Sequence, residues 1–263
     1  RRSSDLSTET SSFERLIEIG IALSAERDTN RLMETILLEA KSLSNADGGT
    51  LYLSDEDGNL KFEIMRTDSL NIAMGGTTGK EITFPPVRVR DPETGKENRA
   101  NVASSSALTG ESINIPDAYT SQDYDFIGTK KFDEGTGYHS QSFLTVPMKN
   151  SQNEVIGVLQ LLNAQTQDTG EVIPFGGDIQ PLIEALASQA AVAMDNKQLL
   201  DAQKALLDSF IELIGSAIDS KSPYTGGHCQ RVPELTKMLA ESACGETDGP
   251  FADFNGVVEE VNY

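Results

Sequence analysis

The spacing of apolar residues predicts two helices in the first part of the chain. Apolar side chains recur every three or four residues over 12–25 and again over 32–43, which is the pattern of amphipathic helices. Asp28 or Thr29 is placed to cap the second helix. Residues 1–11 are polar and rich in serine and threonine, so we expect them to form a disordered tail.

Strand-like alternation follows the second helix. Leu60, Phe62 and Ile64 alternate with charged residues, as in a strand with one buried face. Polar turns or loops separate the predicted strands, which are 50–53, 60–65, 71–74, 81–84, 112–115, 142–148 and 155–162. Because several neighbouring strands are joined by short turns, we expect an antiparallel sheet and an α+β fold over about 12–195.

Two other stretches interrupt the predicted sheet. Residues 102–108 predict a short helix that ends at Gly110. The polar, proline-containing stretch 85–101 is typical of a surface insertion, and 117–137 of a loop with some helix.

A second helical period begins at residue 178 and continues to about 221. Its positions step alternately by four and three residues, a 3.5-residue repeat typical of coiled coils. The repeat, interrupted by two lysines, runs through Leu186, Ala190, Ala193, Lys197, Leu200, Lys204, Leu207, Ile211, Ile214 and Ile218. We therefore expect a homodimer through this helix and the first one. The alternative is an amphipathic helix packed on its own domain. A last helix is predicted over 228–243.

Charge and cysteine content narrow the possible partners and compartment. There are 41 acidic against 21 basic side chains, a net charge of −20 that disfavours nucleic acid and anionic membranes. No apolar run approaches the ~20 residues that span a bilayer. The cysteines, Cys229 and Cys244, fit a reducing, cytoplasmic compartment. The chain begins with Arg1 rather than methionine, so we expect a piece of a longer protein.

The segment 114–142 is the first candidate for chemistry. It combines aromatic rings, carboxylates, hydroxyls and glycines near the start of a predicted core strand, an inventory that suits a flat heterocycle with polar edges. The alternative is that its tyrosines and phenylalanines only anchor the loop on the sheet.

The strings at 114–119, 132–149 ("FDEGTGYHSQSFLTVPMK") and 155–163 ("VIGVLQLLN") resemble the GAF domains of cyclic-nucleotide phosphodiesterases. The resemblance covers about 12–195 and implies a six-stranded antiparallel sheet with helices on both sides. It also implies a small-molecule site, with a cyclic nucleotide as one candidate ligand. The matching ligand positions are Val102, Ala103, Asp133, Thr136, Ser140 and Gln160.

A dispersed Asn-Lys…Phe…Asp-Glu signature marks the nucleotide-binding members of that family. Asn163 and Phe175 match it here. Ala164 stands in place of the lysine, and Ile179 with Gln180 in place of the acidic pair.

The second candidate is the Gly-Gly turn before His228. His228 and Arg231 would lie on one face of a helix, where an imidazole can ligate a metal. The alternative is a capped helix with an exposed histidine. Residues 222–243 resemble the opening helix of HD and HD-GYP metal-dependent phosphohydrolases, which implies that His228 is a metal ligand in an intact parent domain using a divalent metal.

The chain lacks the His-Asp dyad that names the HD family. His139 is followed by Ser140, and His228 by Cys229. We therefore expect no catalytic residue and no cofactor in this chain, whatever the activity of its parent.

Together these observations predict a tail at 1–11, a GAF sensory domain at 12–195, a helical linker at 196–221 and the start of an HD domain at 222–263. The domain would bind a small molecule and signal through a dimeric helix to a phosphodiesterase, with a cyclic dinucleotide such as cyclic di-GMP as the leading substrate. The alternatives are a ligand-free dimerisation module, or a cyclic-nucleotide sensor with no hydrolase role.

Overall fold

The structure is a computed structural model that describes the backbone of residues 2–221 and 228–244, and the side chains of 14–217 and 231–244. The chain forms two compact units, and the boundary between them in the sequence falls between Gln198 and Leu199. We describe each unit by itself.

The first unit opens with the two predicted helices, α1 (Arg2–Ala25) and α2 (Thr29–Ser44). Helix α1 begins at Arg2, ten residues before the start expected from the apolar spacing. Asp28 caps α2, as predicted, by accepting a 2.8 Å hydrogen bond from the Arg31 amide. Asn45 ends the helix in the left-handed conformation.

One antiparallel sheet forms the centre of this unit. Within the described residues its order is β3-β2-β1-β6-β5-β4, with β7 paired to β6. The strands are β1 (Ala46–Ser54), β2 (Leu60–Thr67), β3 (Ile72–Gly75), β4 (Ile113–Ile115), β5 (Phe143–Lys149), β6 (Val155–Gln165) and β7 (Val172–Ile173). The α+β prediction is confirmed, and the two-residue strand β7 is the addition to the six strands expected.

The predicted strand at 81–84 is absent from the described structure. The short helix η1 (Gly76–Thr78) follows β3, and Gly75, Gly76 and Gly79 all have positive φ angles, which turn the chain away from the sheet edge. Backbone pairing with the sheet resumes only at Val87, opposite Leu60.

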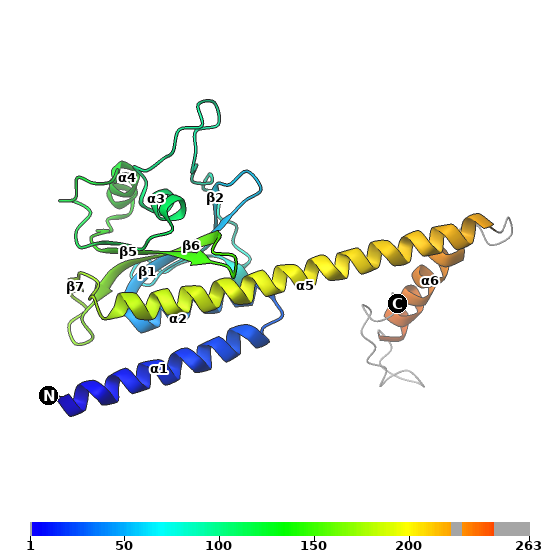
Figure 1. Ribbon diagram of the computed structural model, residues 1–263, viewed down its shortest axis with the longest axis horizontal. Helices are drawn as coiled ribbons and strands as arrows, with labels where there is room; N and C mark the ends of the chain where they lie inside the picture. The colour runs from blue at the N-terminus through cyan, green and yellow to red at the C-terminus, as the bar shows by residue number, and fades with distance from the viewer. Residues whose placement is uncertain (1, 222–227, 245–263) are drawn as a thin grey trace. The chain divides into compact units, whose positions relative to one another are not determined.

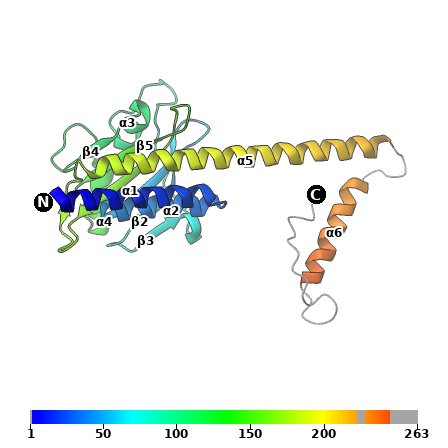
Figure 2. The same cartoon turned by 60° about the horizontal axis from the view of Figure 1, so that its bottom comes forward.

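Helices cover both faces of the sheet (Figures 1 and 2). Helices α3 (Val102–Thr109) and α4 (Ile127–Thr136) lie on one face, and α2 and α1 lie on the other with the first part of α5 (Ile179–Lys221). The short helix predicted over 102–108 is confirmed, including its end at Gly110.

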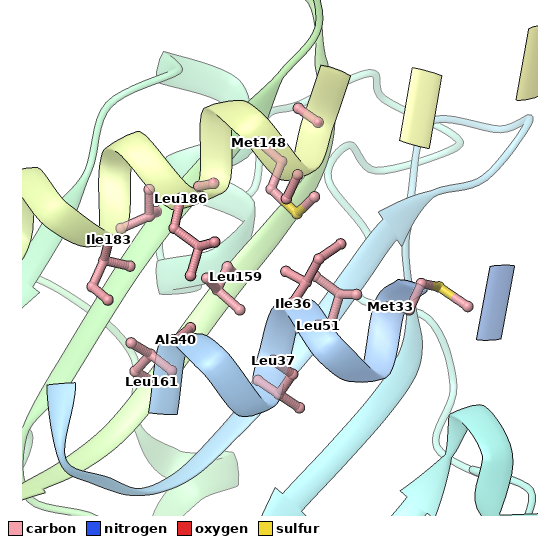
Figure 3. Packing of buried hydrophobic residues seen from close by; sticks show 14 of the residues in the cluster. Met33, Ile36, Leu37, Ala40, Leu51, Met148, Leu159, Leu161, Ile183 and Leu186 are labelled. Atoms are coloured by element: carbon pink, nitrogen blue, oxygen red, sulfur yellow. The ribbon is translucent and has the colours of Figure 1, made fainter. Parts of the chain in front are cut away.

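The main hydrophobic core lies between the sheet and the helices α2 and α5 (Figure 3). Its labelled side chains come from both helices and from three strands: Met33, Ile36, Leu37, Ala40, Leu51, Met148, Leu159, Leu161, Ile183 and Leu186. Gly49 allows α2 to approach β1 closely, since a Cβ there would lie 2.8 Å from Leu37 Cδ1.

The start of α5 belongs to this core. Leu186, Ala190 and Ala193 are 0%, 0% and 8% exposed. For these three positions the predicted coiled-coil repeat is wrong and the alternative, packing on the same domain, is correct.

The second unit contains the rest of α5 and helix α6 (His228–Cys244). Both helices were predicted. In the part of the chain that the structure describes, no helix has the length and apolarity needed to cross a membrane.

Candidate functional site

A stripe of polar side chains crosses the sheet beneath α3. Thr50 on β1, Gln160 on β6 and Thr145 on β5 are direct cross-strand neighbours and all are buried. Alternate residues of the same strands, such as Leu51 and Leu159, face the main core on the opposite side. The stripe therefore faces the layer formed by α3 and α4.

Gln160 is the centre of this stripe. Its Nε2 donates to Thr145 Oγ1 at 3.1 Å, and its Oε1 accepts from the Tyr52 hydroxyl at 3.3 Å. Burial raises the pKa of Tyr52, so its hydroxyl keeps its proton as a donor. The sequence analysis identified Gln160 but not Thr50, Tyr52 or Thr145.

Helix α3 covers the stripe. Val102 packs in a cluster with Phe126 and Phe143, whereas Ala103 packs in another with Tyr52. The helix begins here because the side chain of its N-cap Asn101 accepts from the amide of Ser104.

Ser104 itself carries an unusual group. Its side chain is fully buried, and its Oγ has no hydrogen-bond partner among the described residues. Buried polar atoms are nearly always paired, so an unpaired hydroxyl on α3 calls for a functional explanation.

A second polar centre surrounds Asp133 on α4. This carboxylate is 4% exposed and accepts three hydrogen bonds: from the Tyr119 hydroxyl at 2.7 Å, and from the Ser140 amide and hydroxyl at 2.8 Å each. The bond to Asp133 raises the pKa of Tyr119 to about 12. Asp133 and Thr136 lie in α4, the helical part of the stretch predicted as a loop with some helix, and Thr136 is exposed and donates to the Phe132 carbonyl.

Tyr119 also carries two ring contacts. The His139 imidazole stacks on the Tyr119 ring at 4.3 Å between centroids, and Lys130 Nζ lies 5.2 Å from the same ring centre. An aromatic surface beside a cation and a buried carboxylate suits a flat, polar ligand.

The segment between α4 and β5 is fixed by two further side chains. Asn163 Oδ1 accepts from the amides of Gln141 and Ser142, and its Nδ2 donates to the His139 carbonyl. Tyr138 donates to the buried Asp47 at 2.6 Å. Burial, followed by this bond, raises the pKa of Tyr138.

Phe175, the other residue that matches the dispersed signature, packs in the core of the domain. Phe175 is 5% exposed in the main core, and its carbonyl accepts from Asn114 Nδ2 at 3.2 Å. Thus Asn163 shapes the loop beside Asp133, while Phe175 connects the core to the middle of β4.

The predicted site residues therefore fall into separate groups. Asp133 and Ser140 are in direct contact, and Gln160 lies in the sheet stripe. Val102 and Ala103 form part of the covering helix, and Thr136 stands apart. His228 begins α6, but its side chain lies outside the described residues.

The described residues do not form a hydrolytic metal centre. Over the described ranges, no three His, Cys, Asp or Glu side chains are grouped so that they could hold a metal ion. The sequence has two histidines, and neither precedes an aspartate.

Residues 28–194 match the GAF domain family. This chain belongs to the GAF domain family. It is 28% identical over 209 residues to dual 3′,5′-cyclic-AMP and -GMP phosphodiesterase 11A of Takifugu rubripes, a match that covers 78% of this chain and 21% of that protein. The chain thus spans about a fifth of that relative's length.

Solved GAF domains share the fold. The GAF domain of the Acinetobacter phosphoenolpyruvate-protein phosphotransferase has a TM-score of 0.52 and 12% identity, over 73% of this chain and 98% of its own. The corresponding Coxiella burnetii domain has a TM-score of 0.53 and 16% identity, over 73% and 96%. The family match and the antiparallel sheet confirm the GAF prediction for the first unit.

Proposed function

We propose that this chain is a ligand-responsive regulatory region whose GAF domain binds a small planar molecule, with a cyclic nucleotide as the first candidate. The observation that carries the proposal is the buried stripe of Thr50, Gln160 and Thr145 beneath α3. Buried polar groups must be hydrogen-bonded, whereas apolar side chains would pack this face without that requirement, so a polar stripe across a central sheet favours a binding role over a packing role.

The chemistry of the stripe suits a nucleobase. A glutamine amide offers one donor and one acceptor side by side, which is how Asn and Gln pair with base edges. Gln160 now uses both groups on Thr145 and Tyr52. A guest would take over one of these bonds, and the displaced hydroxyl, which can rotate, would turn toward the guest.

Two further observations favour a ligand on this side. The Ser104 hydroxyl is buried without a partner in the described structure. The relative from Takifugu rubripes is named for two cyclic nucleotides, although the similarity covers only 21% of it.

Calorimetry with cyclic GMP and cyclic AMP tests the binding proposal. We expect binding heat from at least one of them, and a roughly tenfold weaker Kd for Gln160→Leu, equivalent to about 1.4 kcal/mol. Gln152→Leu in the exposed β5–β6 turn is the matched control and should bind like the parent chain. Heats equal to dilution for both nucleotides would refute the nucleotide assignment and leave a ligand-free module.

The proposed output is a downstream HD-type phosphohydrolase reached through a homodimer of the terminal helices. Its support is the resemblance of residues 222–243 to the first helix of that family, with His228 as a metal ligand in the intact parent. A divalent metal, a cyclic dinucleotide substrate and a cytoplasmic location belong to the same proposal. Sequencing the parent gene beyond Tyr263 tests it, since the absence of a His-Asp pair in the following domain would remove the hydrolase.

Sedimentation of the 263-residue chain tests the dimer separately. The exposed apolar side chains of α5, described below, favour self-association. A monomer at tens of micromolar would remove both the dimeric signalling helix and the alternative of a dimerisation scaffold.

A further inference from the structure

In the second unit, α5 carries two neighbouring apolar stripes. The first contains Leu199, Leu206, Phe210 and Leu213, which are 55%, 72%, 57% and 65% exposed. The second contains Leu200, Leu207, Ile211 and Ile214, also exposed. The predicted 3.5-residue repeat follows the second stripe. Exposed apolar surface of this extent marks an interaction site, so the question is which stripe forms the centre of the interface.

Charge distinguishes the stripes. In a parallel two-fold dimer, each residue of the central seam faces the same residue of the second copy. The second stripe would place Lys204 against Lys204, and one heptad earlier Lys197 against Lys197. Like charges in contact destabilise such a pair.

The first stripe is free of charge. The positions that alternate with its three leucines in the 3.5-residue repeat are Asn196, Gln203, Phe210 and Ala217. An amide has both donor and acceptor groups and can pair with its own copy. In this heptad frame Leu199, Leu206 and Leu213 occupy d positions, where leucine is typical of parallel coiled coils, and a polar residue at an a position fixes their register.

The exposure of earlier residues on α5 also favours the first stripe as the centre of the interface. By sequence spacing, the second stripe continues to Ala193, Ala190 and Leu186, which are buried in the core of the first unit. The same spacing carries the first stripe to Val192, which is 42% exposed.

Val192 lines an open groove within the first unit. The groove, of about 660 Å³, lies between α1 and α5 and is lined mainly by apolar or small side chains, among them Ile17 and Ile21. These two isoleucines are 60% and 66% exposed. Gln189 also lines the groove, and its Oε1 is buried without a hydrogen-bond partner in the described structure.

We infer that a second copy of this chain docks in parallel along Leu199, Leu206, Phe210 and Leu213 of the second unit, with Gln203 as a polar member of the seam. Leu200 and Leu207 then flank the interface instead of forming its centre. This inference rests on the dimer of the proposed function and names its contact face.

Cysteine cross-linking separates the two faces. In the full chain with Cys229→Ser and Cys244→Ser, we expect Leu199→Cys and Leu206→Cys to form disulfide-linked dimers on mild oxidation. The neighbouring Leu200→Cys and Leu207→Cys are the matched controls, and we expect at least fivefold less cross-linking because a disulfide needs Cα atoms within roughly 7 Å.

Polar-to-apolar variants give a second measurement that does not depend on oxidation. Gln203→Leu should tighten the dimer Kd by about tenfold in sedimentation, since it buries an apolar side chain at the seam. Lys204→Leu should change that Kd by less than about threefold, because residue 204 lies outside the seam.

The outcomes are distinct. Dimers that cross-link at 200 and 207, or equally at all four positions, overturn the inferred face and leave the proposed dimer intact. A larger effect of Lys204→Leu than of Gln203→Leu does the same. A monomeric parent chain overturns both.

Discussion

At the scale of single residues, Asp133 is a tightly held acid of the candidate site. It is buried and accepts three hydrogen bonds from Tyr119 and Ser140, and the described part of the chain gives it no ion pair. Neutral donors alone keep this carboxylate in place, so its partners should titrate differently from free side chains.

We predict that the Tyr119 hydroxyl titrates near pH 12. The hydrogen bond to Asp133 raises its pKa from the ordinary 10.0 to about 12, because ionised tyrosine would face the carboxylate. A group with a raised folded-state pKa loses its contribution to stability as pH rises from 10 to 12. NMR titration of ¹³C-labelled tyrosine measures it, with Tyr119→Phe for assignment. Asp133→Asn should bring the pKa back toward 10, and a wild-type value already near 10 would contradict the bond.

A second residue-scale feature is the ion pair between Glu34 and Arg66. The Arg66 side chain is 8% exposed, and its Nη2 lies 2.5 Å from Glu34 Oε1. Burial alone would raise the pKa of Glu34, but hydrogen bonds from Thr77 and Arg66 and the Arg66 charge outweigh it and hold the pKa below 4.5. The pair joins α2 to β2.

We predict that Glu34→Gln lowers the free energy of unfolding at pH 7 by about 2 kcal/mol, because it leaves a buried guanidinium without its charge partner. A carboxyl with a lowered pKa stabilises above about pH 4.5 and loses this effect as the pH falls through its folded value. The difference from wild type should therefore shrink below pH 4 in urea titrations.

Glu39→Gln on the same helix is the control. Its partner Arg15 is 45% exposed, and exposed pairs contribute about 0–1 kcal/mol. If both variants lost the same free energy of unfolding, burial of the Glu34–Arg66 pair would not increase its contribution to stability.

At the scale of elements, the connection from α4 to β5 determines where Asp133 and Ser140 meet. Asn163 on β6 holds this connection through the amides of Gln141 and Ser142 and the carbonyl of His139. Its own backbone is left-handed, with φ of 53°. The side chain thus adds three bonds to the backbone bond from the Asn163 amide to the Ser142 carbonyl, where the loop enters the sheet.

We predict that Asn163→Ala costs about 3 kcal/mol more stability than Asn153→Ala, measured by urea unfolding. Both positions have positive φ, so alanine is strained at each. Asn153 is exposed, whereas Asn163 is 2% exposed and its loss leaves buried amides unpaired. Similar costs at both sites would mean that backbone strain, rather than the three hydrogen bonds, explains the asparagine.

At the scale of the whole molecule, the proposed function requires ligand binding and dimer formation to be coupled. Allosteric coupling is a free energy shared by two sites, typically 1–3 kcal/mol. Both GAF faces of the sheet contribute: the stripe with Gln160 faces α3, and the alternate residues contact the start of α5.

We predict that saturating cyclic GMP changes the dimer Kd of the chain by about fivefold or more. Because the dimer holds two nucleotide sites, linkage requires that the calorimetric Kd per site differ by the square root of that factor, about twofold, between dilutions below and above the dimer Kd. Sedimentation with and without nucleotide measures the first factor. Binding that leaves the dimer Kd unchanged would separate the sensor from the helix and contradict signalling through dimerisation.

Local pattern determined the kinds of element and much of the core. The alternation of Leu60 and Ile64 and the helical spacing of Ile36 and Ala40 report which face is buried, because periodicity follows backbone geometry within a few residues. For the same reason the α+β class, the cap at Asp28 and the long α5 could be predicted from sequence.

Only the tertiary structure decided which polar residues meet. Thr50 lies far in sequence from Gln160, and their contact depends on the register of β1 against β6, which no local pattern encodes. Likewise, a 3.5-residue spacing fits two adjacent apolar stripes along α5, and the sequence does not distinguish them. The structure does, because Leu186, Ala190 and Ala193, which have the spacing of the second stripe, are buried in the core of the first unit. Long-range pairing and competition for one helix face are properties of the folded chain.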